Sequence, residues 1–304
     1  MKNHEMEILK IDYSLLMDLR VDFAFKAFVE SNPEALVSLL NAIFANAKIR
    51  RIVKNVRLKN PTFDKKSIED KLSILDVRAE LEDGTDILIE MHLHGIGQIL
   101  AKMIRSWARA YSEELETSQK FASQPPTIAI AFVNGAIEPI EKPESDTDEI
   151  HGVYMIMNKK NGAVLTNAME LHFIDMKAFA KAVNEANSIN IEQATDDMFT
   201  YWLSVITEKE ILNKDIIENA RKEKEVIGMA VSAIARQSED KNMRQAYQRR
   251  KDEIFFHNVE LEQATRRAEQ ATHRAEQAER EKEQANAEIE NLRQQVAALQ
   301  ANQK

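Results

Sequence analysis

The sequence has no cysteine, no signal-peptide pattern and no long apolar run. Without cysteine the chain forms no disulfide, and thiolate metal sites and cysteine nucleophiles are excluded. The N-terminal residues do not show the basic and then apolar pattern of a signal peptide. No apolar stretch approaches the roughly 18 residues needed to span a bilayer. We therefore expect a soluble, cytoplasmic protein that has no membrane partner.

Aromatic residues are also scarce, at 6%, whereas charged residues make up 30% of the chain, a mixture that often marks a long solvated helix. The net charge of −9 argues against a general nucleic-acid binder. One segment is nevertheless basic, and only Asp64, Glu69 and Asp70 oppose its cationic residues, which are Lys48, Arg50, Arg51, Lys54, Arg57, Lys59, Lys65, Lys66 and Lys71. This segment is either a solvated surface or a face that contacts DNA phosphates.

The apolar pattern predicts a mixed α/β domain followed by helices. Helices are expected at 21–29, at 36–44 with Asn32 as cap and Pro33 in the first turn, and at 95–116. A β-hairpin is expected at 72–93, strands at 127–133 and 171–174, and a loop at 138–152. From about Thr195 the pattern is helical throughout. We expect a domain at 1–195, a helical extension at 196–256 and a coiled coil at 257–304.

The coiled coil is predicted from a seam whose spacing alternates between three and four residues. The seam consists of Leu261, Ala264, Ala268, Ala271, Ala275, Ala278, Lys282, Ala285, Ile289, Leu292, Val296 and Leu299. Alanine buries little area, so the association energy should come mainly from Ile289 to Leu299. The tail is interpreted as a homo-oligomerising coil. A helix folded back on its own domain and a solvated single helix are the alternatives.

Two neighbouring strands carry the residues that could perform chemistry. In the strand from Asp86 to His94, alternation places Glu90 and the imidazoles of His92 and His94 on the face opposite an apolar stripe. The preceding strand contains Asp76 between Leu75 and Val77, and a carboxylate there is costly unless it is solvated, paired or bound to a metal.

The turn between these strands decides whether Asp76 and Glu90 lie together. A two-residue turn at Asp83-Gly84 would pair Asp76 with Met91 and put it on the wrong face. A three-residue loop at 83–85 would pair Asp76 with His92 and leave Glu90 diagonal to Asp76, and Gly84 can adopt the left-handed conformation such loops need. We therefore predict an odd-length loop or a bulge.

Carboxylates on adjacent strands suit Mg²⁺, a hard ion that prefers oxygen ligands and that can activate water for attack on a phosphate. Other interpretations remain open at this stage. Asp76 could pair with Arg78 or Lys71 at a sheet edge, and Glu90 and His92 could lie on an ordinary solvent-facing strand. A zinc site formed by Glu90, His92 and His94 would also compete.

Several segments together resemble the recombination-promoting nuclease/putative transposase family of the PD-(D/E)XK nuclease superfamily. They are residues 22–28 (DFAFKAF), 71–79 (KLSILDVRA), 84–92 (GTDILIEMH), 105–112 (RSWARAYS), 127–132 (TIAIAF) and 201–203 (YWL). The resemblance covers about residues 15–255 and excludes the tail. It implies a restriction-endonuclease-like core, a small mixed sheet flanked by helices, that hydrolyses DNA phosphodiester bonds with Mg²⁺ or Mn²⁺ in recombination or transposition.

The resemblance also implies roles for individual residues. Asp76 would be the family's aspartate and Glu90 the glutamate of its (D/E)-x-K element, and the backbone carbonyl of Met91 would be a further metal ligand. Asp22 and Lys26 would support the site from the entry helix, although core packing also explains that phenylalanine-rich segment. His92 departs from the pattern, because this position is lysine in the superfamily and usually glutamine in the family.

The presence of histidine at position 92 does not decide whether the protein cleaves DNA. Neutral imidazole can orient a water and imidazolium can contact a phosphate, but the substitution could also change the pH dependence or abolish cleavage. The first alternative function is therefore a degenerate nuclease that binds DNA or a protein without cutting. The second is a coiled-coil interaction protein whose globular part only supports the tail.

Overall fold

The computed structural model describes residues 11–59, 77–93, 96–113, 124–137, 150–185 and 197–301. The chain divides into a first compact unit that ends at Arg250 and a second that begins at Lys251. None of the helices in the described ranges combines the length and apolar character needed to cross a membrane.

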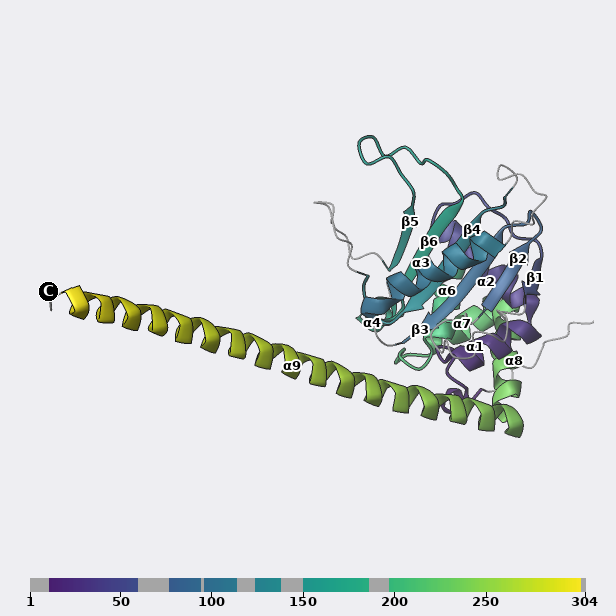
Figure 1. Cartoon of the computed structure of the whole chain (residues 1–304). Coiled ribbons are helices and arrows are strands. Elements are labelled where there is room, and N and C mark those ends of the chain that lie inside the picture. Colours follow the sequence, from purple (N-terminus) through teal and green to yellow (C-terminus); the bar gives the residue numbers. More distant parts are fainter. Residues whose placement is uncertain are drawn as a thin grey trace, which may run out of the picture. The chain divides into compact units, whose positions relative to one another are not determined.

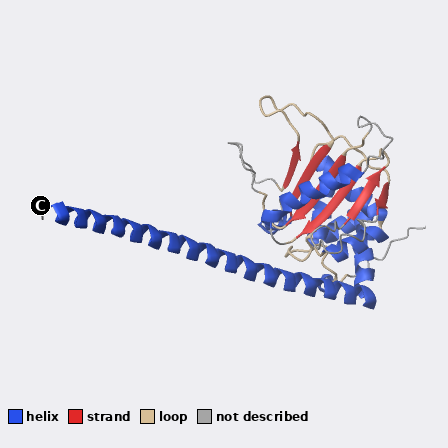
Figure 2. Cartoon of the chain, in the orientation of Figure 1, coloured by secondary structure: helices blue, strands red, loops and turns tan. Residues whose placement is uncertain are grey.

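Within the described residues, six strands form one mixed sheet (Figures 1 and 2). They are β1 (Val56–Lys59), β2 (Val77–Leu81), β3 (Asp86–His92), β4 (Thr127–Val133), β5 (His151–Met155) and β6 (Met169–Asp175). Their order across the sheet is β1-β2-β3-β4-β6-β5. The central strands β3, β4 and β6 are parallel, whereas the pairs β1–β2, β2–β3 and β5–β6 are antiparallel. Every residue of β4 is buried, as expected for a central strand covered on both faces.

Helices pack on both faces of this sheet, and eight are present among the described residues. They are α1 (Asp22–Ser31), α2 (Pro33–Asn46), α3 (Ile96–Glu113), α4 (Met176–Glu185), α6 (Met198–Ile206), α7 (Asp215–Glu223), α8 (Glu225–Glu239) and α9 (Lys241–Ala301). Helix α3 packs Ile99, Met103 and Trp107 against one face. On the other face Phe25 of α1 lies 6.1 Å from Phe132 of β4 between ring centroids. The predicted restriction-endonuclease-like α/β fold is confirmed.

The sequence missed three elements of the sheet region. Strands β1 and β5 are short and lie at the two edges of the sheet, where their residues are only partly buried. Partly buried edge strands have little apolar alternation, which is why β5 begins inside the loop that was predicted to continue to Gly152. Helix α4 was not predicted either. The predicted helix start at Pro33 is confirmed, but the side chain of Asn32 donates to the carbonyl of Phe28 and does not cap α2.

The hairpin between β2 and β3 has an odd-length loop, as predicted, but its position was wrong by one residue. Val77 pairs with Ile89 and Glu80 with Asp86, and the amide of Leu81 donates to the carbonyl of Thr85. The loop is therefore residues 82–84. Gly84 ends the loop at a φ of +84°, a left-handed conformation that costs glycine little. The predicted pairing of Asp76 with His92 required Val77 opposite Met91, whereas Val77 lies opposite Ile89. The predicted register is therefore wrong by two residues. Because side chains alternate with period two, each side chain still points to the predicted face of the sheet.

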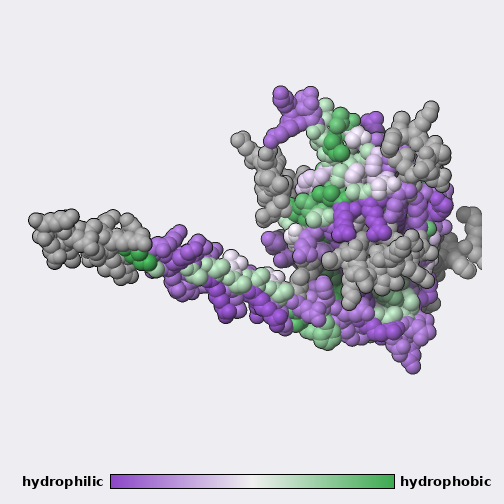
Figure 3. Space-filling model, in the orientation of Figure 1, coloured by the Kyte–Doolittle hydropathy of each residue, from purple (hydrophilic) through white to green (hydrophobic). Residues whose placement is uncertain are grey.

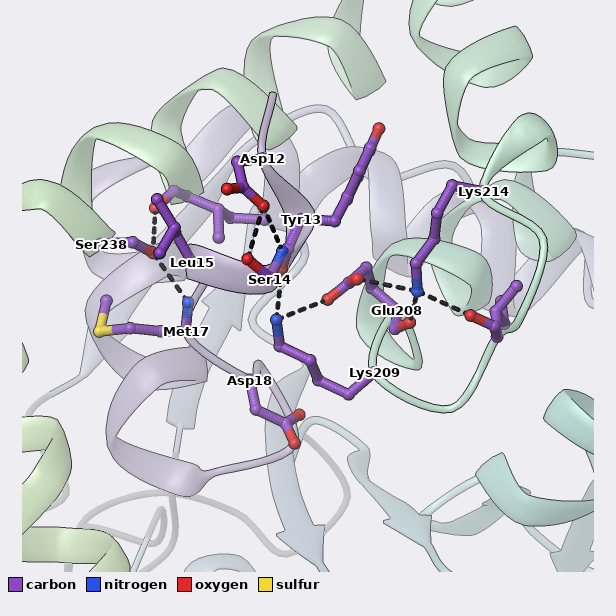
Figure 4. A network of polar contacts seen from close by, with 12 residues as sticks. Asp12, Tyr13, Ser14, Leu15, Met17, Asp18, Glu208, Lys209, Lys214 and Ser238 are labelled. Carbon is purple, nitrogen blue, oxygen red and sulfur yellow. Dashed lines mark hydrogen bonds and ion pairs between the residues drawn. The ribbon is translucent and has the colours of Figure 1, made fainter. Parts of the chain in front are cut away.

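Helices that follow the sheet pack back onto the N-terminal segment. Figure 4 shows that Ser238 of α8 accepts a hydrogen bond from the amide of Met17 at 2.8 Å, while Lys209 donates to the carbonyl of Tyr13. Tyr247 of α9 accepts from the amide of Asp18 at 3.1 Å. The first turns of α9 therefore belong to the first unit.

The second unit is the continuation of α9 from Lys251 to Ala301. Its described side chains are mostly exposed, including the seam alanines up to Ala285 and Ile289 at 47%. Figure 3 shows pale apolar surface running along this part of the helix between hydrophilic side chains. The described seam positions are thus exposed, and the coiled coil stays a prediction.

Candidate active site

Glu90 is a carboxylate buried inside the first unit. It lies on the face of β3 that α3 covers, and only 2% of the surface of Glu90 is exposed. Lys102 of α3 forms an ion pair with its Oε1 atom. Its Oε2 atom is also buried and has no hydrogen-bond partner among the described residues. Because a buried polar atom without a partner is costly, this oxygen marks a position for a further ligand.

The environment of Glu90 changes its proton affinity in opposing ways. Burial raises the pKa of Glu90 above its ordinary value, and the nearby ammonium of Lys102 acts against that rise. The carboxylate of Asp22 raises this pKa further, whereas the guanidinium of Arg250 lowers it. These four side chains are called the charge cluster, in which one ion pair joins Glu90 to Lys102 and another joins Asp22 to Arg250.

Asp22 enters this cluster from the first residue of α1, which follows directly on the segment held by α8 and α9. Arg250 of α9 binds both carboxylate oxygens, with Nε 2.9 Å from Oδ1 and 2.8 Å from Oδ2. The amide of Phe23 also donates to Oδ1. Lys26, one turn later on α1, lies 3.9 Å from Glu30 in a partly exposed ion pair. Asp22 is thus held by Arg250, whereas Lys26 pairs with Glu30.

A second buried carboxylate, Asp86, lies on the same face of β3, four residues before Glu90. Arg78 of β2 binds its Oδ2 atom through Nε at 2.8 Å and NH2 at 2.7 Å, and donates through NH1 to Glu113 of α3 at 3.1 Å. Lys59 of β1 lies 3.6 Å from Oδ1 of Asp86. This network ties β1, β2, β3 and α3 together beside Glu90.

The other predicted site residues have different surroundings. Met91 is buried on the opposite face of β3. His92 is half-buried at the end of β3, paired with Val133 of β4. Asp76, which directly precedes Val77, lies outside the described residues, and so does His94. Among the described residues no three acidic, histidine or cysteine side chains converge as a metal cluster.

The basic segment is only partly described. Arg57 and Lys59 of β1 both pair with Glu80 of β2, at 2.6 and 2.8 Å. Arg51 donates to the hydroxyl of Thr85 at 3.1 Å. Lys65, Lys66 and Lys71 lie outside the described residues. The positive charge of the described part is therefore partly neutralised within the sheet.

The donor set fits a hard divalent cation. Glu90 offers a buried carboxylate oxygen without a hydrogen-bond partner among the described residues, and the charge of Asp22 acts on this carboxylate. Mg²⁺ is commonly held by one or two carboxylates together with waters and substrate phosphates. Such a site needs no cage of three protein side chains.

Sequence reasoning missed Lys102 and Arg250, which complete the cluster. Lys102 had a weak signal, because it follows Ile99 by three residues on a helix whose apolar side had to face the strand that carries Glu90. Arg250 had no signal, since it lies 228 residues from Asp22. Only the packing of α9 against α1 brings those two together.

Comparison with known proteins identifies a family. A family model described as PD-(D/E)XK nuclease family transposase matches residues 19–264, which include the whole described cluster. Neither the curated proteins nor the solved structures gave a significant match.

Proposed function

Because the chain belongs to the PD-(D/E)XK nuclease family transposases, we propose that it is a metal-dependent DNA endonuclease acting in recombination or transposition. It hydrolyses phosphodiester bonds with Mg²⁺ or Mn²⁺. The observation that carries this proposal is Glu90, which has one oxygen in an ion pair with Lys102 and the other buried without a hydrogen-bond partner among the described residues. A carboxylate with that environment suits a metal ligand better than a purely structural ion pair.

Glu90 and Asp76 are the proposed side-chain ligands, with the backbone carbonyl of Met91 as a third. Asp76 is bonded to Val77, whose partner across the ladder is Ile89, the neighbour of Glu90. This position in the sequence supports Asp76 as the source of the second carboxylate. The metal would activate a water and stabilise charge on the phosphate under attack.

The remaining side chains keep Glu90 ionised, orient the attacking water and bind the DNA. Lys102 favours the ionised form of the buried Glu90. His92, at the end of β3, orients the attacking water or contacts the phosphate in place of the lysine or glutamine of the pattern. Asp22 adds negative charge, and Lys26, partly exposed on the next turn of α1, contacts the DNA backbone. The tail from residue 257 brings copies of the chain together as a homo-oligomer.

The test is cleavage of supercoiled plasmid in Mg²⁺ or Mn²⁺ by the full chain. Wild type should cut, whereas Glu90→Gln and Asp76→Asn should lose at least about 100-fold in rate, because each removes a ligand charge. Glu260→Gln, at an exposed position on α9, is the matched control and should cut like wild type. Equal cleavage by wild type and Glu90→Gln would disprove the assignment.

A degenerate nuclease that binds DNA without cutting is the second candidate, and His92 is the observation that favours it. In that case neither wild type nor Glu90→Gln cuts, but both bind DNA with an affinity that falls steeply with salt. Cleavage that appears only in His92→Gln would identify this chain as a nuclease that has lost its activity at that position.

A further inference from the structure

Lys102 of α3 is the member of the Glu90 ion pair that reaches solvent. Its side chain is 25% exposed, whereas the side chain of Glu90 is only 3% exposed. An ammonium group has three N–H donors, and among the described residues its hydrogen-bond partner is Oε1 of Glu90. A DNA phosphate that approaches Glu90 from the exposed side of this pair therefore meets the ammonium group first.

The hydrophobic core sets the position of Lys102 on α3. Ile99, three residues before it, and Ser106, four residues after it, are both buried. Residues three or four apart lie on one side of a helix, so Lys102 lies at the edge of the face that packs on the sheet. Packing of α3 therefore keeps the ammonium near Glu90, and the ion pair is not needed to bring it there.

The pair differs from the one that compensates Asp86. Arg78 binds Oδ2 of Asp86 through Nε at 2.8 Å and NH2 at 2.7 Å, and the side chain of Arg78 is only 9% exposed. That guanidinium is enclosed and committed to its carboxylate. Lys102 is more exposed and contacts one oxygen of Glu90, as expected of a cation that can also bind a second anion.

We propose that Lys102 is a catalytic residue that binds the scissile phosphate beside Glu90. This inference rests on the proposed metal-dependent cleavage. Glu90 keeps Oε2 for the metal while Oε1 holds the ammonium, so both cations can act at one carboxylate. Lys102 then takes the phosphate contact, and His92 is left to orient the attacking water.

The contribution of Lys102 to hydrolysis is electrostatic. The attacking water forms a bond to phosphorus and gives up a proton, while the bond from phosphorus to the leaving ester oxygen breaks and that oxygen takes up a proton. Negative charge develops on the phosphate oxygens in this step. A cation held in place by the packing of α3 stabilises that charge without moving.

Two measurements on the full chain test this role. The first is single-turnover cleavage of a short DNA duplex in Mn²⁺. The second is binding of the same duplex in Ca²⁺, which also takes oxygen ligands, measured by fluorescence anisotropy over a range of salt concentrations. A gel confirms that the duplex is intact after the binding measurement.

Lys102→Met removes the ammonium and should slow cleavage by about 100-fold or more. It should also lower the slope of log affinity against log salt by about one, as expected when one phosphate contact is lost. Lys102→Arg keeps the positive charge, so it should preserve the slope and lose less rate. Lys222→Met removes an exposed lysine from α7 and should change neither quantity.

The outcomes separate this inference from the function on which it rests. If Lys102→Met cuts as fast as wild type, Lys102 has no part in catalysis. If it cuts slowly but keeps the wild-type salt slope, Lys102 is only the counter-charge of Glu90 and the inference is again wrong. In both cases loss of cleavage in Glu90→Gln would leave the metal site standing. If wild type does not cut, the proposed function and this inference fall together.

Thermal unfolding of each variant shows whether the measured proteins are folded. Loss of Lys102 leaves the buried Glu90 without its cation, which is expensive. If Lys102→Met does not fold, Lys102→Gln takes its place with the same expected results, because its amide still donates to Glu90 but carries no charge.

Discussion

Buried charges in this protein are compensated by specific partners. Glu90 has Lys102, Asp86 has Arg78, and on the far face of the sheet Glu170 accepts a hydrogen bond at Oε1 from Nε2 of His172 at 2.9 Å. Such pairs add little net stability compared with apolar residues, but loss of one partner leaves an uncompensated charge that is expensive. Both carboxylates of β3, Asp86 and Glu90, lie on the face of the sheet that α3 covers.

The histidine pair gives a pH prediction. His151 Nε2 lies 2.9 Å from Nδ1 of the fully buried His172. Burial, followed by the charge of His172, lowers the pKa of His151 to about 3. As the pH falls, His151 is therefore protonated near pH 6.5 in the unfolded chain but only near pH 3 in the folded chain. The stability from this group is complete above pH 6.5 and is lost as the pH falls toward 3, by roughly 2 to 4 kcal/mol after allowance for partial exposure.

Urea unfolding at pH 7.5, 5.5 and 4.5 measures this effect. His151→Gln should lose less stability than wild type over that range, because it has no imidazole to protonate. His257→Gln, at an exposed position on α9, should follow wild type. If all three proteins lose stability equally as the pH falls, the buried imidazole is not the source of the loss.

At the scale of elements, the hairpin loop between β2 and β3 sets the register that brings Glu90 beside the end of β2. Gly84 makes this loop possible at φ +84°. Among the described residues a methyl group there would meet Pro125, at 3.6 Å, so there is space for it and the cost is conformational. Gly84→Ala should destabilise the protein by about 1 to 2 kcal/mol, as expected for a left-handed alanine.

The midpoint of urea unfolding checks this prediction. Gly97→Ala, at the start of α3 where an added methyl group meets no described residue within 4 Å, is the matched control. It should be neutral or slightly stabilising, because alanine favours a helix more than glycine does. Equal effects of the two substitutions would show that the loop does not require its left-handed residue.

At the scale of the whole molecule, the seam on α9 should produce self-association. Ile289→Asp places a charge in the seam, where the largest apolar residues begin, and should weaken association by at least about tenfold. Ala287→Asp adds the same charge two residues away, outside the seam, and should associate like wild type. Sedimentation velocity of the full chain distinguishes them. A wild-type chain that is monomeric at micromolar concentration would disprove the coiled-coil prediction.

The sequence by itself determined the class of fold, because period-two and helical apolar patterns along β3, β4, α3 and α9 follow from which faces must be buried. The resemblance of its segments determined the family, which the family match to residues 19–264 confirms. Alternation also predicted which face of β3 carries Glu90, since side-chain direction in a strand depends only on position.

Tertiary structure decided the rest. The register of the β2–β3 hairpin depended on where Gly84 adopts its left-handed conformation, and a pattern that allows two registers with the same faces cannot choose between them. Edge strands β1 and β5 have weak apolar alternation because much of their surface is not buried. The pairs Glu90–Lys102 and Asp22–Arg250 exist only because α3 and α9 pack where they do. Local sequence determines which residues point inward, but long-range packing alone determines which charges meet.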